Sequence, residues 1–301
     1  MNPVSPVPGL PENPSHANVS TPSTRNEREL RSSALSLLAQ TDVRSKTEGV
    51  RQLASAWQDD IVGLDCVKAL KPTGILPGRP AAPQLVPPLQ VPQRSMNTVE
   101  GRAALIHALA HIEFNAVNLA LDAIWRFAGM PDAYYADWLQ IADEEALHFT
   151  LLANHLRQSG FAYGDFPAHD GLWEMAEKTS EDILARMALV PRTREARGLD
   201  ASPSIRSRLF QAGDRDAAAI LDIILRDEIG HVAIGNRWYA WLCRWQGRDP
   251  VHAYRELARK HRAPQLRGPF NLAARRAAGF TDEELELLQQ TSFATIDTTR
   301  K

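Results

Sequence analysis

Two long apolar helical patterns in this chain are each interrupted by the tetrad Glu-x-x-His. The tetrads are Glu145 with His148 in "EEALHF", and Glu228 with His231 in "RDEIGH". Three residues span just under one helical turn, so each glutamate and its histidine leave the same face of a helix. A carboxylate oxygen and an imidazole nitrogen placed this way are suited to hold one metal ion. Because the tetrad alone often occurs by chance, it constrains the fold only together with the residues that precede it.

A lone glutamate precedes each tetrad at nearly the same distance. Glu113 lies 32 residues before Glu145, and Glu195 lies 33 residues before Glu228. Turn residues lie about midway between the members of each pair. At about 1.5 Å per residue, the two carboxylates of such an antiparallel hairpin come to nearly the same level. Two such hairpins predict an all-α, four-helix bundle that gathers four carboxylates and two imidazoles.

Buried carboxylates need a counter-charge. One ionised carboxylate buried alone costs several kcal/mol, and four together should not stay ionised without cations. Two divalent ions offset four carboxylates formally, and oxygen-rich ligation with two imidazoles suits iron or manganese, as Fe/Fe or Fe/Mn. The predicted ligands of two metal ions are Glu113, Glu145, His148, Glu195, Glu228 and His231.

The ligand from the third helix is the least determined of the six. Pro191 and the stretch "GLDASP" (198–203) interrupt the helical pattern around Glu195. Glu181 is the alternative, but it lies 32 residues before Gly213, too far along a continuous helix. Both Glu195 and Glu181 therefore remain candidates for the metal ligand from the third helix.

Other polar residues near the tetrads have simpler expected roles. Asp227 adjoins Glu228 and could accept a hydrogen bond from the far nitrogen of His148 or His231, which would fix the tautomer. We expect Glu144 to face solvent. His107 and His111 are expected to be structural, His169 is expected to order its loop, and a pocket role is open for His155. Trp238, Trp241 and Trp245 are expected to pack.

The rest of the chain divides by composition. Residues 1–26 are rich in Pro, Ser, Asn and Thr and predict a disordered leader. Residues 27–97 predict two small helices followed by an extended proline-rich strap (76–95). The bundle is expected over 98–247, with a third helix starting near Leu172, and a C-terminal helical extension over 248–301.

Bulk properties indicate a soluble, cytoplasmic protein without a membrane partner. The net charge of −2 gives no general attraction to nucleic acid or an acidic membrane. Cys66 and Cys243 have no CxxC spacing, which argues against disulfides and a cysteine zinc site. No secretory pattern begins the chain, and no apolar run approaches the roughly 20 residues of a membrane span. Apolar helical faces are compatible with a homodimer, which the sequence does not decide.

Several long segments resemble a known group of proteins, including "HIEFNAVNLALDAIWRF", "WLQIADEEALHF", "RDEIGHVAIG" and "LRGPFNLAARRAAGF". The chain resembles the ferritin-like di-metal carboxylate proteins, most closely the uncharacterised bacterial ferritin-like family called domain of unknown function 455. The resemblance covers roughly residues 30–290. It implies a ferritin-like bundle with a di-iron or mixed-metal centre on the six residues named above, and it implies no substrate.

These patterns favour an oxidoreductase that activates dioxygen to oxidise or hydroxylate an unidentified substrate. Its electrons would come from an external donor, because no flavin or nicotinamide fingerprint is present. One variant acts on tRNA through an arginine-biased surface. The alternatives are an iron-handling or other non-enzymatic metal-binding protein, and a metal-free scaffold whose carboxylates pair with arginines. The arginines concerned are Arg186, Arg192, Arg194, Arg197, Arg206 and Arg208.

Overall fold

The computed structural model describes residues 28–298, and side chains as far as residue 290. The predicted leader, residues 1–26, lies outside the described residues. Over residues 28–298 the backbone forms helices and connecting loops, with isolated bridges such as that between Leu85 and Ala168 but no strand. The all-α prediction is confirmed.

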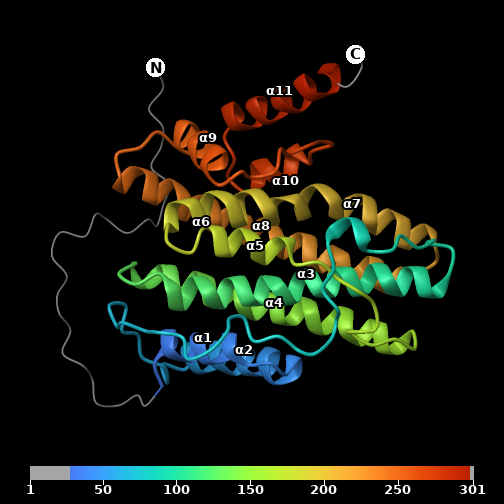
Figure 1. Cartoon of the computed structure of the whole chain (residues 1–301), viewed down its shortest axis with the longest axis horizontal. Helices are drawn as coiled ribbons and strands as arrows, with labels where there is room; N and C mark the ends of the chain where they lie inside the picture. The colour runs from blue at the N-terminus through green and yellow to red at the C-terminus, as the bar shows by residue number, and fades with distance from the viewer. Residues whose placement is uncertain (1–27, 299–301) are drawn as a thin grey trace.

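Four long rods form the centre of the fold (Figure 1). Helices α3 (Val99–Arg126) and α4 (Asp132–Gln158) make one hairpin. Helix α8 (Arg215–Trp245) pairs with α7 (Ala196–Gln211) in a second hairpin, and α4 packs on α8 to join the two. The ends are set by local chemistry, since the Thr98 side chain accepts a hydrogen bond from the backbone N–H of Gly101 at the start of α3.

The third rod is not the helix that the sequence predicts. It comprises α5 (Gly171–Lys178), α6 (Ile183–Leu189), a π-helical segment η2 (Val190–Glu195) and then α7. Pro191, which has no backbone N–H to donate, lies in the π-helical turn instead of ending the helix. The expectation that "GLDASP" interrupts the helix is also wrong, because α7 continues through Pro203.

Small helices cover the two outer faces of the bundle (Figure 1). Helices α1 (Leu30–Ala39) and α2 (Val43–Gln58) lie against α3 and α4. The proline-rich strap follows them, with one short 3-10 turn, η1 (Pro88–Gln90). Helices α9 (Pro250–Lys260), α10 (Leu272–Ala277) and α11 (Asp282–Thr298) lie on the far side, over α6, α7 and α8.

Helix α3 is long and apolar enough to cross a membrane by length and composition, contrary to the expectation from the sequence. However, 72% of its most apolar stretch is buried inside the fold. The helix also carries the buried carboxylates Glu113 and Asp122. Its burial is that of a core helix, and an ionisable group buried in such a helix needs a partner.

Candidate metal centre

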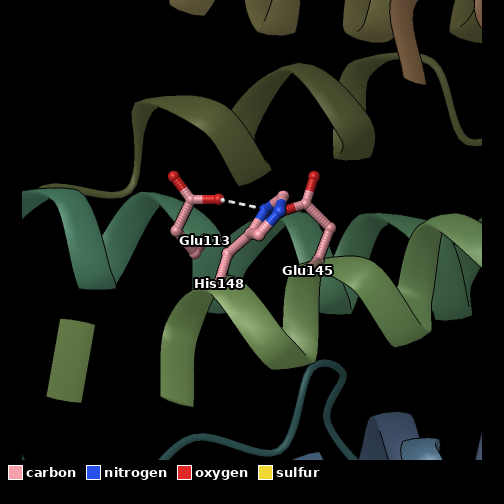
Figure 2. A group of neighbouring side chains, drawn as sticks. All are labelled: Glu113, Glu145 and His148. Carbon is pink, nitrogen blue, oxygen red and sulfur yellow. Dashed lines mark hydrogen bonds and ion pairs between the residues drawn. The ribbon is translucent and has the colours of Figure 1, made fainter. Parts of the chain in front are cut away.

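Side chains from the four rods converge in the interior of the bundle. Glu113 comes from α3, and Glu145 and His148 come from the facing turn of α4, as Figure 2 shows. Glu228 and His231 come from α8. All five are buried, and their donor atoms form two groups whose members lie within 4.8 Å of one another. One group contains Glu113, Glu145 and His148, and the other contains Glu145, Glu228 and His231.

Glu145 lies between the two histidines and is shared by both groups. Its Oε2 atom is 3.4 Å from Nδ1 of His148, and its Oε1 atom is 3.0 Å from Nδ1 of His231. Glu113 Oε2 lies 3.3 Å from the same nitrogen of His148, and Glu228 Oε2 lies 3.9 Å from that of His231. The two imidazole centroids are 5.8 Å apart. Each half thus offers one imidazole nitrogen and one carboxylate of its own, with Glu145 between them.

The outward nitrogen of each histidine meets a carboxylate from the other tetrad's helix. His148 Nε2 lies 3.1 Å from Asp227 Oδ2 on α8, and His231 Nε2 lies 2.6 Å from Glu144 Oε2 on α4. When Nε2 donates its proton outward, the neutral imidazole presents Nδ1 as a lone-pair donor to the interior. That is the tautomer in which a histidine binds a metal.

The expectation that Glu144 faces solvent is wrong, because its carboxylate orients His231 and is only partly exposed. A sequence pattern could have revealed its role. An acidic residue directly precedes the glutamate of both tetrads, in "EEALH" and in "DEIGH". Asp227 precedes one tetrad and was expected to bond to a histidine. Glu144 has the same position before the other tetrad, so the same role could have been expected for it.

Several buried polar atoms of this cluster have no hydrogen-bond partner. They are Glu113 Oε2, Glu145 Oε1, Glu195 Oε2, Glu228 Oε2 and His231 Nδ1. More than nine in ten buried polar groups in proteins are paired, so five unpaired atoms around one point need an explanation. A cation would satisfy the carboxylate oxygens, and it would also bind His231 Nδ1 once that nitrogen has lost its proton. The buried carboxylates and imidazoles could therefore hold metal.

Burial and mutual repulsion shape the protonation of the cluster. Burial, together with the charge of Glu145, raises the pKa of Glu113 to about 8 and that of Glu195 to about 8. The pKa of Glu228 is raised well above its usual value by the same causes. Burial also acts on Glu145, but the charge of His231 and hydrogen bonds from both histidines outweigh it and hold that pKa well below its usual range. Without a cation the cluster retains protons, which a metal would displace.

Of the two glutamates considered for the third rod, Glu195 is buried near Glu145 and Glu181 is exposed. Glu195 ends the π-helical segment, is 9% exposed, and lies close enough for the charge of Glu145 to act on it. It is not a member of either compact group of donor atoms. Glu181 is exposed in the loop between α5 and α6. Glu195 is thus beside the centre, with its Oε2 buried and unpaired.

Two of the other histidines have polar partners outside the cluster. The backbone N–H of Gly164 donates to His107 Nε2, and His155 Nε2 lies 3.0 Å from Asp214. Of the tryptophans, Trp238 is buried and donates to Asp137, whereas Trp245 is 61% exposed. The rings of Trp238 and Trp241 contact each other, and Trp245 stacks on Trp241, so the expectation of packing is confirmed.

Three arginines of the third rod form ion pairs with carboxylates other than the four proposed ligands. Arg186 pairs with Asp122, Arg206 pairs with Asp222, and Arg192 pairs with Glu284. Within residues 28–290, no ion pair joins an arginine to any of the four glutamates proposed as ligands. Among the described residues, the ion-pair contacts of Glu113, Glu145 and Glu228 are with His148 and His231.

Comparison with known proteins places the chain beside uncharacterised relatives. Residues 39–286 match the family described as "Protein of unknown function (DUF455)". An uncharacterized protein of Haemophilus influenzae is 48% identical over 240 residues, which are 77% of this chain and 83% of the relative. No solved structure matches the chain significantly.

Proposed function

We propose that this chain, which belongs to the DUF455 family of proteins of unknown function, is a di-metal carboxylate protein and acts as an oxidoreductase. The observation that carries the proposal is the position of Glu145, with one carboxylate oxygen turned to each of two inward-facing imidazoles. A single carboxylate between two nitrogen donors is suited to join two neighbouring cations. The unpaired buried oxygens around it supply the further ligands.

The proposed ligands are divided between two sites. Glu113 and His148 would hold one ion and Glu228 and His231 the other, with Glu145 shared. Glu195, which is buried beside the cluster, would complete the second site. Four carboxylates and two imidazoles favour iron or manganese, as Fe/Fe or Fe/Mn, over metals that prefer thiolates.

Two reduced iron ions at this position would supply the electrons that reduce dioxygen. The chain's own residues then do three things. Asp227 and Glu144 hold the imidazoles with Nδ1 turned inward. The apolar side chains of the bundle exclude bulk water, which strengthens every electrostatic interaction inside. Glu113 and Glu195, whose pKa values are raised in the metal-free cluster, would release their protons when metal binds.

Two alternatives remain as outcomes of the test. An iron-handling protein uses the same ligands without oxidising an organic substrate. A metal-free scaffold needs the carboxylates to pair with arginines, and the arginines of the third rod are instead paired with Asp122, Asp222 and Glu284. The substrate, the external electron donor and a tRNA partner belong to the proposal and would be sought only after the metal chemistry is established.

The test is to add ferrous ion to apoprotein without oxygen, remove the excess, and then mix the protein with dissolved dioxygen. We expect oxygen uptake in proportion to bound iron and an absorbance change that is complete after about one turnover in the absence of reductant. Continued uptake with added iron, leaving many irons per chain, would indicate iron handling. Absence of bound iron would indicate the scaffold.

A further inference from the structure

A hollow of about 350 Å³ lies between α9 and α11. These two helices are on the side of the molecule away from α1 and α2 (Figure 1). None of the six proposed metal ligands lines it. Protein interiors contain few voids larger than one water molecule. At about 30 Å³ per water, this hollow would hold roughly a dozen of them. Its size is at the lower end of that of pockets for small organic ligands.

The wall on the α9 side is one face of a helix. Val251, Tyr254 and Ala258 follow one another at helical spacing along the hollow, whereas Leu257 faces the core. Phe280 and the leucines of α11 form much of the remaining wall. Most of the lining is therefore apolar, and water in contact with it is less favourable than an apolar ligand.

Two of the four arginines that line the hollow are neutralised by the fold. Arg192 is buried, pairs with Glu284, and lies 4.8 Å from the centroid of the Phe280 ring. Arg275 is fully buried and pairs with Asp200 at 2.8 Å. These two arginines support the wall, and they leave no net charge for a ligand.

The other two arginines, Arg255 and Arg259, are exposed on successive turns of the same face of α9. Among the residues that the structure describes, the guanidinium group of neither arginine makes a hydrogen bond or an ion pair. Like charges at this spacing repel one another. The C-terminal end of a helix favours cations and accounts for Arg259 in the last turn of α9. It does not account for two unpaired guanidinium groups at the edge of an apolar hollow.

We propose that this hollow binds a small organic anion, with its apolar body between α9 and α11 and its charged group at Arg255 and Arg259. A guanidinium group binds a carboxylate or a phosphate through paired N–H donors. Both head groups share this chemistry, and the occupant is a free small molecule in either case. The site stands independently of the metal centre.

The test uses anilinonaphthalene sulfonate, whose fluorescence rises in apolar sites, and phenylnaphthylamine, which has the same rings without the anion. The full-length protein should bind the sulfonate at one site. The double substitution Arg255→Gln and Arg259→Gln should weaken that binding by about tenfold or more and leave phenylnaphthylamine unaffected. Ala258→Phe, which fills the hollow, should weaken the binding of both probes. The matched control is Arg276→Gln, an exposed arginine of α10 outside the hollow.

Decanoate and decyl phosphate, below the concentrations at which they form micelles, then compete with the sulfonate. Displacement by the first alone identifies a carboxylate ligand, and displacement by the second alone identifies a phosphate ligand. Displacement by both supports the site as a general anion site, and displacement by neither overturns it. Equal binding of the sulfonate to the wild type and to the double variant would also overturn the proposal.

Discussion

His148 on α4 is held by Asp227 on α8, with 3.1 Å between Nε2 and Oδ2. The contact crosses from one helical hairpin to the other, and His231 makes the reverse contact with Glu144. The acidic residue that directly precedes each tetrad thus orients the other tetrad's histidine. Metal binding and the docking of α4 on α8 therefore depend on the same contacts.

Removing the charge of Asp227 should weaken metal binding without unfolding the bundle. In Asp227→Asn we expect about a 10- to 100-fold loss in metal affinity, because the carboxylate no longer supports the Nε2–H of His148. The measurement is a titration with ferrous or manganous ion, followed by calorimetry. Asp222→Asn, on an exposed part of the same helix, is the control and should bind as the wild type does. An unchanged affinity in Asp227→Asn would contradict this role.

Glu195 and Glu181 should differ sharply when each is changed to glutamine. Glu195 is buried beside the cluster, so Glu195→Gln should lower the metal content or weaken the second site by about tenfold or more. Glu181 is exposed and should tolerate the same change. Metal content per chain, measured after identical loading, decides between them. Loss of metal in Glu181→Gln alone would reverse the assignment.

A buried and an exposed ion pair should contribute differently to stability. Arg186 pairs with Asp122, with both side chains buried, so Arg186→Met should lower the free energy of unfolding by about 3–5 kcal/mol. The pair of Arg206 with Asp222 is largely exposed, so Arg206→Gln should lower it by less than about 1 kcal/mol. Urea unfolding of both variants measures the difference. If the free energy of unfolding falls by a similar amount in both variants, the buried pair of Arg186 contributes no more to stability than the exposed pair of Arg206.

Acid should destabilise the fold partly through His107. Burial lowers the pKa of His107 to about 4, whereas an unfolded histidine titrates near 6.5. Between these values the unfolded chain binds the extra proton and the folded chain does not, so the free energy of unfolding falls as pH falls from 6.5 to 4. We expect a loss of about 2 kcal/mol from this residue between pH 7 and about pH 5.

The variant His107→Gln provides the comparison for this pH effect. Glutamine keeps an acceptor for the backbone N–H of Gly164 and has no titration in this range. Urea unfolding at both pH values should therefore show a smaller acid-induced loss in the variant than in the wild type. Equal losses would mean that His107 does not titrate as its burial requires.

Much of the architecture follows from helical periodicity and the positions of turns. The all-α class and the long rods α3, α4 and α8 were predictable, because their apolar stripes and capping residues act locally. The third rod was not, because a proline can be accommodated by a π-helical turn when the surrounding helices bury it, as they bury Pro191. The spacing of apolar residues along the sequence does not reveal whether a π-helical turn can take up a proline.

The candidate site was predictable where spacing along one helix decides the geometry. The two tetrads place Glu145 near both histidines because i, i+3 residues share a face. The role of Glu144 was missed, since its partner His231 is on a helix that begins about 70 residues later and only the packing of α4 on α8 brings them together. The hollow between α9 and α11 was also beyond prediction from sequence, because it depends on how three short helices pack.

The most direct test of the central claim is the metal content of the wild type and of Glu145→Gln after anaerobic loading with ferrous ion. Glu145 is shared by both groups of donor atoms, so its loss should affect both ions, whereas the loss of Glu113 should affect one. The account predicts about two irons per wild-type chain, about one in Glu113→Gln and almost none in Glu145→Gln. Full loading of Glu145→Gln, or a wild-type protein that binds no iron, would contradict it.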